Sequence, residues 1–192
     1  EQVLTPGSTL GFDGRVVSMS DGISFANKFS KKNIKIQDKL DLIDSIWKDR
    51  PPMSEAPVFL LEEKYSGEST ASKLERVRNF MKENGASVHL LITLDDIAWL
   101  LNLRGRDVMF TPVFLAYAAV TMEQVHLFIN ESKISSEIKT VLNNDGIVLH
   151  PYNDVYEFLK ACPSDYSYMV NESIVNSYLL ECIPGTVINH AN

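Results

Sequence analysis

The side chains with the most potential for chemistry lie close together in the sequence: Trp99, Arg104, Arg106 and Asp107. Guanidinium and carboxylate groups can contact the charged parts of a ligand when a rigid scaffold presents them on a loop. A loop that is merely solvated has the same residue composition, so this stretch alone leaves two interpretations open. The elements on either side of it indicate whether the loop is held in place.

A strand followed by a helix is predicted directly before the two arginines. Residues 88–92 form an apolar run typical of a buried strand. Thr93 with Asp96 three positions later is a capping-box pattern, and apolar residues recur at helical spacing across 95–103. We predict that Gly105 closes this helix, because glycine readily adopts the left-handed backbone of a helix end. The arginines and the aspartate are therefore expected on a loop at the end of a strand–helix unit.

Metal and thiol chemistry are not predicted for this chain. The four histidines are scattered, and neither an H-E-x-x-H nor a C-x-x-C motif occurs. They are His89, His126, His150 and His190. Cys162 has no basic neighbour that would activate its thiol. We therefore predict no metal-binding residues and no catalytic residues here.

One serine offers an alternative chemistry. The letters GESTA at 67–71 loosely imitate the nucleophile elbow of α/β-hydrolases, which would make Ser69 the nucleophile of an esterase. The elbow needs its serine on a tight turn directly after a strand, whereas here residues 62–66 lie between the preceding apolar run and this motif. A capping box from Ser72 to Glu75 predicts a helix instead. In that helix Leu74, Val77 and Met81 are expected to point inward, and Lys73, Arg76 and Arg78 to face solvent.

The composition describes an ordinary globular protein and argues against several classes of partner. Of the 192 residues, 45% are hydrophobic and 22% are charged, with a net charge of −7 and an isoelectric point near 5.1. Such an acidic chain is a poor match for nucleic acid or an anionic membrane. No apolar run approaches the roughly 18 residues of a membrane span. Two cysteines without a secretory leader favour a reduced, cytoplasmic setting, and a first residue other than methionine predicts missing sequence upstream.

Three segments are predicted along the chain. Residues 1–50 form a β–α–β–α fragment too small to bury a core alone, with a helix start at Ser18 and a helical apolar stripe within 40–47. The proline-rich segment 51–66 is predicted to be an extended interdomain linker, because proline restricts the backbone and removes hydrogen-bond donors. Residues 67–192 alternate between strand and helix patterns and are predicted to form the main domain.

A mixed β-sheet with helices on both faces is the predicted fold, in the α/β class. The apolar runs 113–121 and 124–129 flank a short turn and predict an antiparallel hairpin. Further strands are predicted at 147–150, 166–170 and 186–188, and helices at 134–141, 154–160 and 174–180. Alternating strands and helices with one hairpin are typical of a mixed sheet that is covered on both sides.

Two blocks of this sequence resemble one family. LDDIAWLLNLRG at 94–105 is followed by D-V-x-x-x-P-V-F-x-x-Y, which ends at Tyr117. The second block comprises WKDRPP at 47–52, PV at 57–58 and YSGES at 65–69. Both resemble the N-terminal region of the three-domain Xaa-Pro aminopeptidases (aminopeptidase P), which belong to the creatinase/prolidase metallopeptidases. Arg106 and Thr111 depart from the family pattern, which usually has serine and asparagine at these positions.

The resemblance implies the non-catalytic front part of such an enzyme, with a creatinase/prolidase N-terminal fold of ribonuclease H-like motif. Residues 1–50 would be the C-terminal remnant of a first N-terminal domain, and 67–192 the second. A catalytic domain, expected to hold two Mn ions, would follow and is absent from this sequence. The implied parent is a cytoplasmic homodimer that removes the N-terminal residue from peptides with proline second. This chain would contact its own C-terminal catalytic domain and bind no cofactor.

The resemblance also implies a role for the stretch with which we began. Residues 104–110 are expected to limit access to a catalytic pocket, in the same subunit or the partner. Arg104 and Arg106 would receive carboxylates of the substrate, and Asp107 would lie on the same loop. Trp99 would pack behind the loop or, alternatively, in the core. The alternative function is a stand-alone, non-catalytic module of the same fold that binds peptides or proteins.

Overall fold

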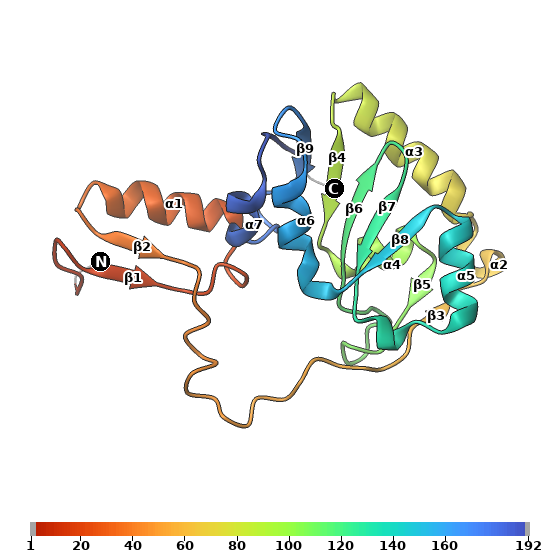
Figure 1. Ribbon diagram of the computed structural model, residues 1–192, viewed down its shortest axis with the longest axis horizontal. Coiled ribbons are helices and arrows are strands. Elements are labelled where there is room, and N and C mark those ends of the chain that lie inside the picture. Colours follow the sequence, from red (N-terminus) through yellow and green to blue (C-terminus); the bar gives the residue numbers. More distant parts are fainter. Residues whose placement is uncertain (1–2, 191–192) are drawn as a thin grey trace.

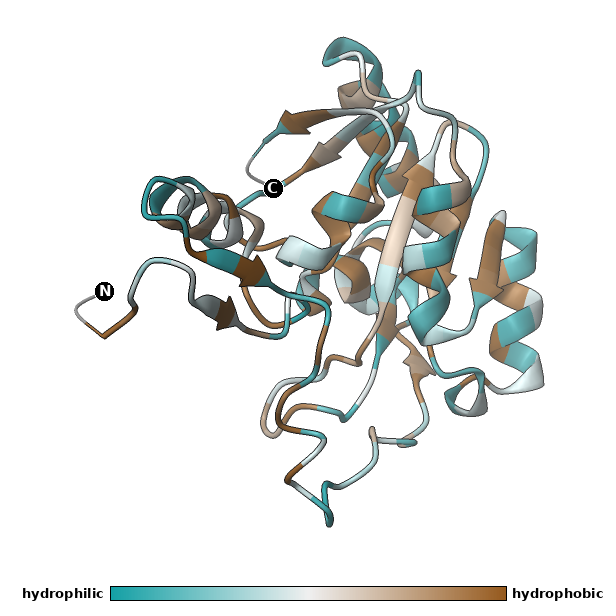
Figure 2. Ribbon diagram, turned by 60° about the vertical axis from the view of Figure 1, so that its left-hand side comes forward, coloured by the Kyte–Doolittle hydropathy of each residue, from teal (hydrophilic) through white to brown (hydrophobic). Residues whose placement is uncertain are grey.

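The computed structural model describes residues 3–190, which form a small N-terminal lobe and a larger sheet domain joined by a long connector, residues 38–57 (Figure 1). No helix in this part of the chain is long and apolar enough to cross a membrane. The larger domain has its hydrophobic residues concentrated on its strands, while hydrophilic residues mark the outer sides of its helices (Figure 2). This distribution is what burial of apolar surface between a sheet and its covering helices requires.

The larger domain is built on a six-stranded sheet with the order β10-β9-β4-β6-β7-β8. Its strands are β4 (Val88–Leu91), β6 (Tyr117–Thr121), β7 (Val125–Phe128), β8 (Ile147–His150), β9 (Ser167–Val170) and β10 (Thr186–Asn189). β6 runs antiparallel to both β4 and β7, whereas the outer pairs are parallel. The predicted mixed sheet and its hairpin are thus confirmed.

Helices cover both faces of this sheet, as predicted (Figure 1). One face packs against α3 (Thr70–Glu83), α4 (Leu94–Leu100) and α5 (Ser136–Asn144). The other face packs against α6 (Val155–Ala161), α7 (Ser177–Cys182) and the start of α1. The side chains of β4 show the alternation of a strand, since Leu91 belongs to the first core whereas Val88 and Leu90 belong to the second.

The small lobe consists of β1 (Thr9–Gly11), α1 (Met19–Ser30) and β2 (Lys35–Gln37), with the two strands parallel. Ser18 caps α1 as predicted, because its hydroxyl accepts the backbone N–H of Asp21 at 3.1 Å. α1 lies against α7 of the larger domain (Figure 1). The backbones come so close that a Cβ on Gly22 would lie 2.6 Å from the Cβ of Ser177.

The second helix predicted for the small lobe, on the stripe Leu40, Ile43, Ile46 and Trp47, does not form. Ile43 and Ile46 lie in turns, Leu40 and Trp47 lie in irregular chain, and all four side chains are exposed. The Asp41 carboxylate accepts the backbone N–H groups of Ile43 and Asp44 at 3.1 and 3.0 Å, which favours a local turn. The prediction was wrong because apolar spacing yields a helix only where a core receives the stripe.

The connector becomes part of the larger domain at Val58, which is buried. The next residues form β3 (Phe59–Leu60), which pairs antiparallel with β5 (Leu103–Arg104), and the short helix α2 (Glu63–Ser66). Two 3₁₀ segments complete the structure, η1 (Glu131–Lys133) and η2 (Tyr152–Asp154). The pairing of β3 with β5 places the end of the connector beside the loop that the sequence singled out.

Candidate functional site

α4 positions Trp99, but its two ends differ from the prediction. Thr93 is the N-cap residue, yet its side chain makes no capping hydrogen bond. The helix ends at Leu100, because Asn102 takes the left-handed conformation with φ of 50°. Asparagine tolerates this backbone because its short side chain hydrogen-bonds locally. Gly105 therefore has a different role from the helix closure that we predicted.

Two cations hold the C-terminal end of α4. Lys73 Nζ donates to the backbone oxygen of Trp99 at 2.8 Å and to Asn102 Oδ1 at 2.6 Å. Arg104 Nη1 donates to the backbone oxygen of Ala98 at 2.6 Å. Positive charge is favourable here because the last carbonyl groups of a helix lack partners and carry partial negative charge. Arg104 is thus a structural anchor of the helix that precedes the loop.

The burial of Lys73 corrects the prediction that it faces solvent, since the residue is only 1% exposed. The N-cap residue of α3 is Ser69 rather than Ser72, and the Ser69 hydroxyl accepts the Ser72 N–H at 3.2 Å. The hydroxyl predicted as a possible nucleophile therefore caps a helix. Burial lowers the pKa of Lys73, although its two oxygen acceptors stabilise the ammonium group.

Trp99 is 43% exposed and lies on a groove of about 460 Å³ between α3, α4 and the sheet. Its ring stands 4.7 Å from Lys73 Nζ and 5.4 Å from the Arg76 guanidinium carbon, both within the range of cation–π attraction. The groove is lined by Arg76, Val77, Phe80, His89, Leu91, Asp96, Trp99, Leu100, Met169 and His190. Trp99 is therefore a groove residue, and the alternative of plain core packing is wrong.

The 104–110 loop is fixed at its base by a close backbone approach. A Cβ on Gly105 would lie 2.7 Å from the Cβ of Phe114, so only glycine fits here without displacing its neighbour. The Gly105 N–H donates to the oxygen of Pro112 at 3.3 Å, and the Asp107 N–H donates to that of Val113 at 3.1 Å. These bonds close the loop on the segment that follows it.

A buried ion pair is the second anchor of the loop. The Asp107 carboxylate contacts the Lys133 ammonium, and the two side chains are 0% and 2% exposed. The same carboxylate accepts the Leu115 N–H at 2.7 Å. Burial raises the pKa of Asp107, but Lys133, the Leu115 N–H and the Ser54 hydroxyl together more than offset this effect and keep the pKa below its ordinary value. Asp107 therefore ties the loop to η1 instead of facing a ligand.

The far end of the loop is apolar and exposed. Val108, Met109 and Phe110 are 40%, 78% and 99% exposed. Phe110 has a φ of 65°, a strained backbone for an aromatic residue, and strain of this kind clusters at functional sites. These three apolar residues line a surface hollow of about 360 Å³. Arg106 is also exposed and borders this hollow, as does Phe59. We call residues 108–110 the loop tip.

The structure separates the four predicted residues into two pairs. Trp99 and Arg106 are exposed but line different hollows, whereas Arg104 and Asp107 have structural contacts. Sequence reasoning missed Lys73 and Lys133, because periodicity treats a lysine as a solvent-facing residue. It also missed the loop tip, for which three successive apolar residues inside a loop were an available signal.

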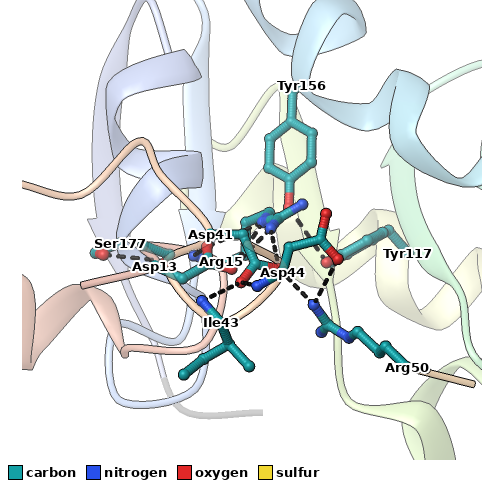
Figure 3. Close-up of polar contacts among 10 residues, drawn as sticks. Asp13, Arg15, Asp41, Ile43, Asp44, Arg50, Tyr117, Tyr156 and Ser177 are labelled. Atoms are coloured by element: carbon teal, nitrogen blue, oxygen red, sulfur yellow. Dashed lines mark hydrogen bonds and ion pairs between the residues drawn. The ribbon is translucent and has the colours of Figure 1, made fainter. Parts of the chain in front are cut away.

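A second polar cluster lies where the small lobe meets the larger domain (Figure 3). Arg15 donates to Asp13 at 2.7–3.1 Å through two nitrogens and to Asp41 at 3.1 Å, and Arg50 reaches Asp41 at 2.5 Å. The Arg15 and Arg50 side chains remain 42% and 43% exposed. We call these four residues the junction cluster. It braces the turn at Asp41 against the lobe.

Backbone contacts dock the lobe on α7 next to this cluster. Met19 N–H donates to the oxygen of Val175 at 2.7 Å, and Ser177 N–H donates to that of Val17 at 2.8 Å. The Ser177 hydroxyl donates to the Gly14 oxygen at 3.1 Å (Figure 3). These bonds satisfy backbone groups that would otherwise be buried without partners. The lobe is thus joined to the sheet domain by direct hydrogen bonds as well as by the connector.

Within residues 3–190 the side chains form no group of three or more His, Cys, Asp or Glu able to hold a metal ion. Cys162 is partly buried and Cys182 is buried, and both are free thiols. Burial raises the pKa of each thiol, which suppresses the reactive thiolate. A two-metal centre therefore does not fit the residues described here.

Comparison with known proteins shows what this chain is similar to. Residues 49–191 match the family described as the Creatinase/Prolidase N-terminal domain. The chain is 43% identical over 118 residues to a probable Xaa-Pro aminopeptidase P of Neurospora crassa, covering 61% of this chain and 17% of that protein. It is 34% identical over 189 residues to aminopeptidase P2 of Arabidopsis thaliana, covering 94% of this chain and 27% of that protein.

One solved structure has the same fold over nearly the whole chain. It is the X-prolyl aminopeptidase of Caenorhabditis elegans, described as a cytosolic enzyme with a di-nuclear active site. The TM-score is 0.91 with 24% identity, and the match covers 98% of this chain and 32% of that one. The similarity establishes the fold. This chain spans about a quarter or less of the length of the two curated relatives.

Proposed function

The chain belongs to the creatinase/prolidase N-terminal domain family, and we propose that it is the non-catalytic front part of an Xaa-Pro aminopeptidase. The family match covers residues 49–191, and both compared relatives are described as aminopeptidases P. The parent enzyme removes the N-terminal residue from peptides with proline second. Its metal ions, two Mn ions by our prediction, belong to a domain outside this sequence.

The part that this chain plays is to shape access to the reaction centre. The observation that carries this function is a loop with a rigid base and an exposed apolar tip. Gly105 and the buried Asp107–Lys133 pair fix the base, while Met109 and Phe110 project without cover from the described residues. A rigid loop holds its tip in one position, so the tip can exclude bulky peptides without an ordering penalty.

The exposed residues of the loop offer two kinds of contact, apolar surface and positive charge. Phe110 and Met109 present apolar surface to the peptide or to the neighbouring domain. Arg106 presents a guanidinium group, which binds a carboxylate through parallel hydrogen bonds. The prolyl bond lacks an N–H, so the enzyme recognises a proline-second peptide by its shape more than by backbone hydrogen bonds. Arg104 and Asp107 contribute by holding the loop in position.

Residues 1–50 form, in this proposal, the end of a first N-terminal domain. Parallel two-stranded sheets rarely stand alone, and no further strand of the described chain pairs with β1 or β2. Leu10 is half-buried and the apolar residues of the nearby turns are exposed, which leaves surface for more chain to cover. Homodimerisation and a cytoplasmic location stay predictions. Sedimentation and fractionation of the full protein test them.

The experiment compares short and long peptides in the full enzyme. Phe110→Ser is expected to raise kcat/KM for a long proline-second peptide relative to a tripeptide by about tenfold, the effect of removing about 1.4 kcal/mol of discrimination. Ile46→Ser is the matched control, since Ile46 is an exposed apolar residue (74%) outside the loop. An unchanged ratio in Phe110→Ser and in Met109→Ser contradicts the access function.

A stand-alone module that binds peptides is the second candidate. The groove beside Trp99 favours it, because an apolar hollow of this size with a few polar groups on its rim is typical of ligand sites. Binding of proline-second peptides to this 192-residue chain, weakened by Trp99→Ala, would support a module that works alone. The absence of binding, together with activity of the full enzyme, would support the aminopeptidase.

A further inference from the structure

Two histidines from neighbouring strands meet on the sheet face that packs against α6. His126 lies on β7 and His150 ends β8, and these strands pair in parallel. His126 Nδ1 is 3.0 Å from His150 Nε2, although the two residues are 24 positions apart in sequence. Both residues are partly buried, and His126 also borders a surface hollow of about 620 Å³. The pair is therefore both preformed and accessible.

Aromatic rings hold the two imidazoles in place. The His126 ring centre is 4.5 Å from that of Phe158, and the His150 ring is stacked on Phe128 at 4.9 Å. Contacts of this kind fix ring orientation, as ligand-supporting contacts do in metal sites. The two facing nitrogens therefore lie in defined positions rather than on mobile surface side chains.

The electrostatic surroundings favour neutral imidazoles that accept a cation. Burial lowers the pKa of both histidines, and the neighbouring His150 lowers the pKa of His126 further. Neutral imidazole is the form that binds metal ions. The carboxylates of Asp154 and Glu131 favour positive charge at His150, and thus a bound cation.

The distance between the facing nitrogens matches a chelate. Two nitrogens bound to one ion at about 2.0–2.1 Å lie about 2.9 Å apart at a right angle and about 3.4 Å apart at a tetrahedral angle. The observed 3.0 Å is closer to the right angle, which square-planar and octahedral ions adopt. We propose that His126 and His150 form a two-histidine site for Cu²⁺ or Ni²⁺, with water in the remaining positions.

Such an ion would join β8, the edge strand of the sheet, to β7. It replaces the hydrogen bond between the imidazoles, and the ring that donates this bond moves its proton to its other nitrogen, so that both facing nitrogens are free to bind the ion. An ion that binds only the folded chain also stabilises it. The site is independent of the proposed aminopeptidase function, because it uses no loop residue and no residue of another domain.

Titration of this chain, without a histidine tag, with NiCl₂ at neutral pH tests the site by calorimetry. We expect one ion per chain and a loss of affinity of about 10- to 100-fold in His150→Gln and in His126→Gln. His89→Gln is the matched control, since His89 is a buried histidine that hydrogen-bonds the Met169 oxygen at 3.2 Å. Equal affinity in His150→Gln and the wild type overturns the proposal, as does the absence of binding.

Electron paramagnetic resonance of the wild type loaded with one equivalent of Cu²⁺ gives a second test that needs no variant. Two coordinated imidazole nitrogens are the expected signature. A spectrum with one nitrogen or none places the ion elsewhere on the chain and contradicts the site. This readout holds even where a glutamine substitution disturbs the packing around Phe158.

Discussion

The buried pair at the base of the loop and the junction cluster use the same chemistry in opposite surroundings. Asp107 and Lys133 form an ion pair with side chains that are almost fully buried, whereas Arg15 and Arg50 share Asp41 at the surface. Water screens an exposed pair, but a buried charge that loses its partner stays desolvated. Substitutions at the base of the loop should therefore lower the free energy of unfolding more than substitutions in the junction cluster.

The largest expected effect comes from breaking the buried pair on one side. Lys133→Met leaves the Asp107 carboxylate buried without its partner, so the free energy of unfolding should fall by about 3–5 kcal/mol in urea titrations. The double variant with Asp107→Leu removes both charges and should recover much of this loss. Full stability in the single variant would show that water reaches the pair.

The buried lysine at the end of α4 ranks next. Lys73→Met keeps the apolar stem but removes the donor to Asn102 and to the Trp99 oxygen, which should lower the free energy of unfolding by about 1–3 kcal/mol. Arg76→Met is the control, because its guanidinium is exposed and also stacks on Trp99. An equal effect of the two variants would remove the distinction between buried and exposed cations.

Acid should affect the loop base in a predictable direction. The folded-state pKa of Asp107 is below its ordinary value, so its carboxylate contributes stability above the unfolded pKa near 3.8. That contribution is lost as the pH falls below this value and through the folded pKa. The free energy of unfolding, measured from neutral pH to pH about 2, should therefore decline less steeply in Asp107→Asn than in the wild type.

The smallest effect is expected at the junction. Arg15→Gln should change the free energy of unfolding by about 1 kcal/mol or less, and high salt should reduce the difference further. The docking of the lobe depends on backbone hydrogen bonds to α7, which this substitution leaves intact. A loss comparable with that of Lys133→Met would show that the exposed cluster is as sensitive as the buried pair.

Much of the larger domain could be predicted from the sequence, because its strands and helices have clear periodicity. The strand at Val88, the hairpin and the Ser18 cap all lie where residue spacing placed them. The comparisons confirm the family resemblance, which rested on two motif blocks. These features depend on local patterns that read directly from the chain.

The candidate site was less predictable because its contacts are long-range. Asp107 meets a lysine 26 positions away, and Arg104 binds a helix end, so neither is available as a free loop charge. The stripe that includes Trp47 shows the opposite error: its apolar residues have helical spacing, but they remain exposed and the predicted helix does not form. Local pattern cannot tell a buried ion pair from a solvated one, nor a covered stripe from an exposed one.

The hydrogen bonds between the lobe and α7 bypass the connector, and this has a consequence for a cut chain. Lys48 is exposed on the connector, so trypsin should cleave there while the folded parts resist. The two pieces should then migrate together on a sizing column, since Met19 and Ser177 still bind the opposite part. Covalent continuity would thus be dispensable for association, and two separately expressed halves should reassemble.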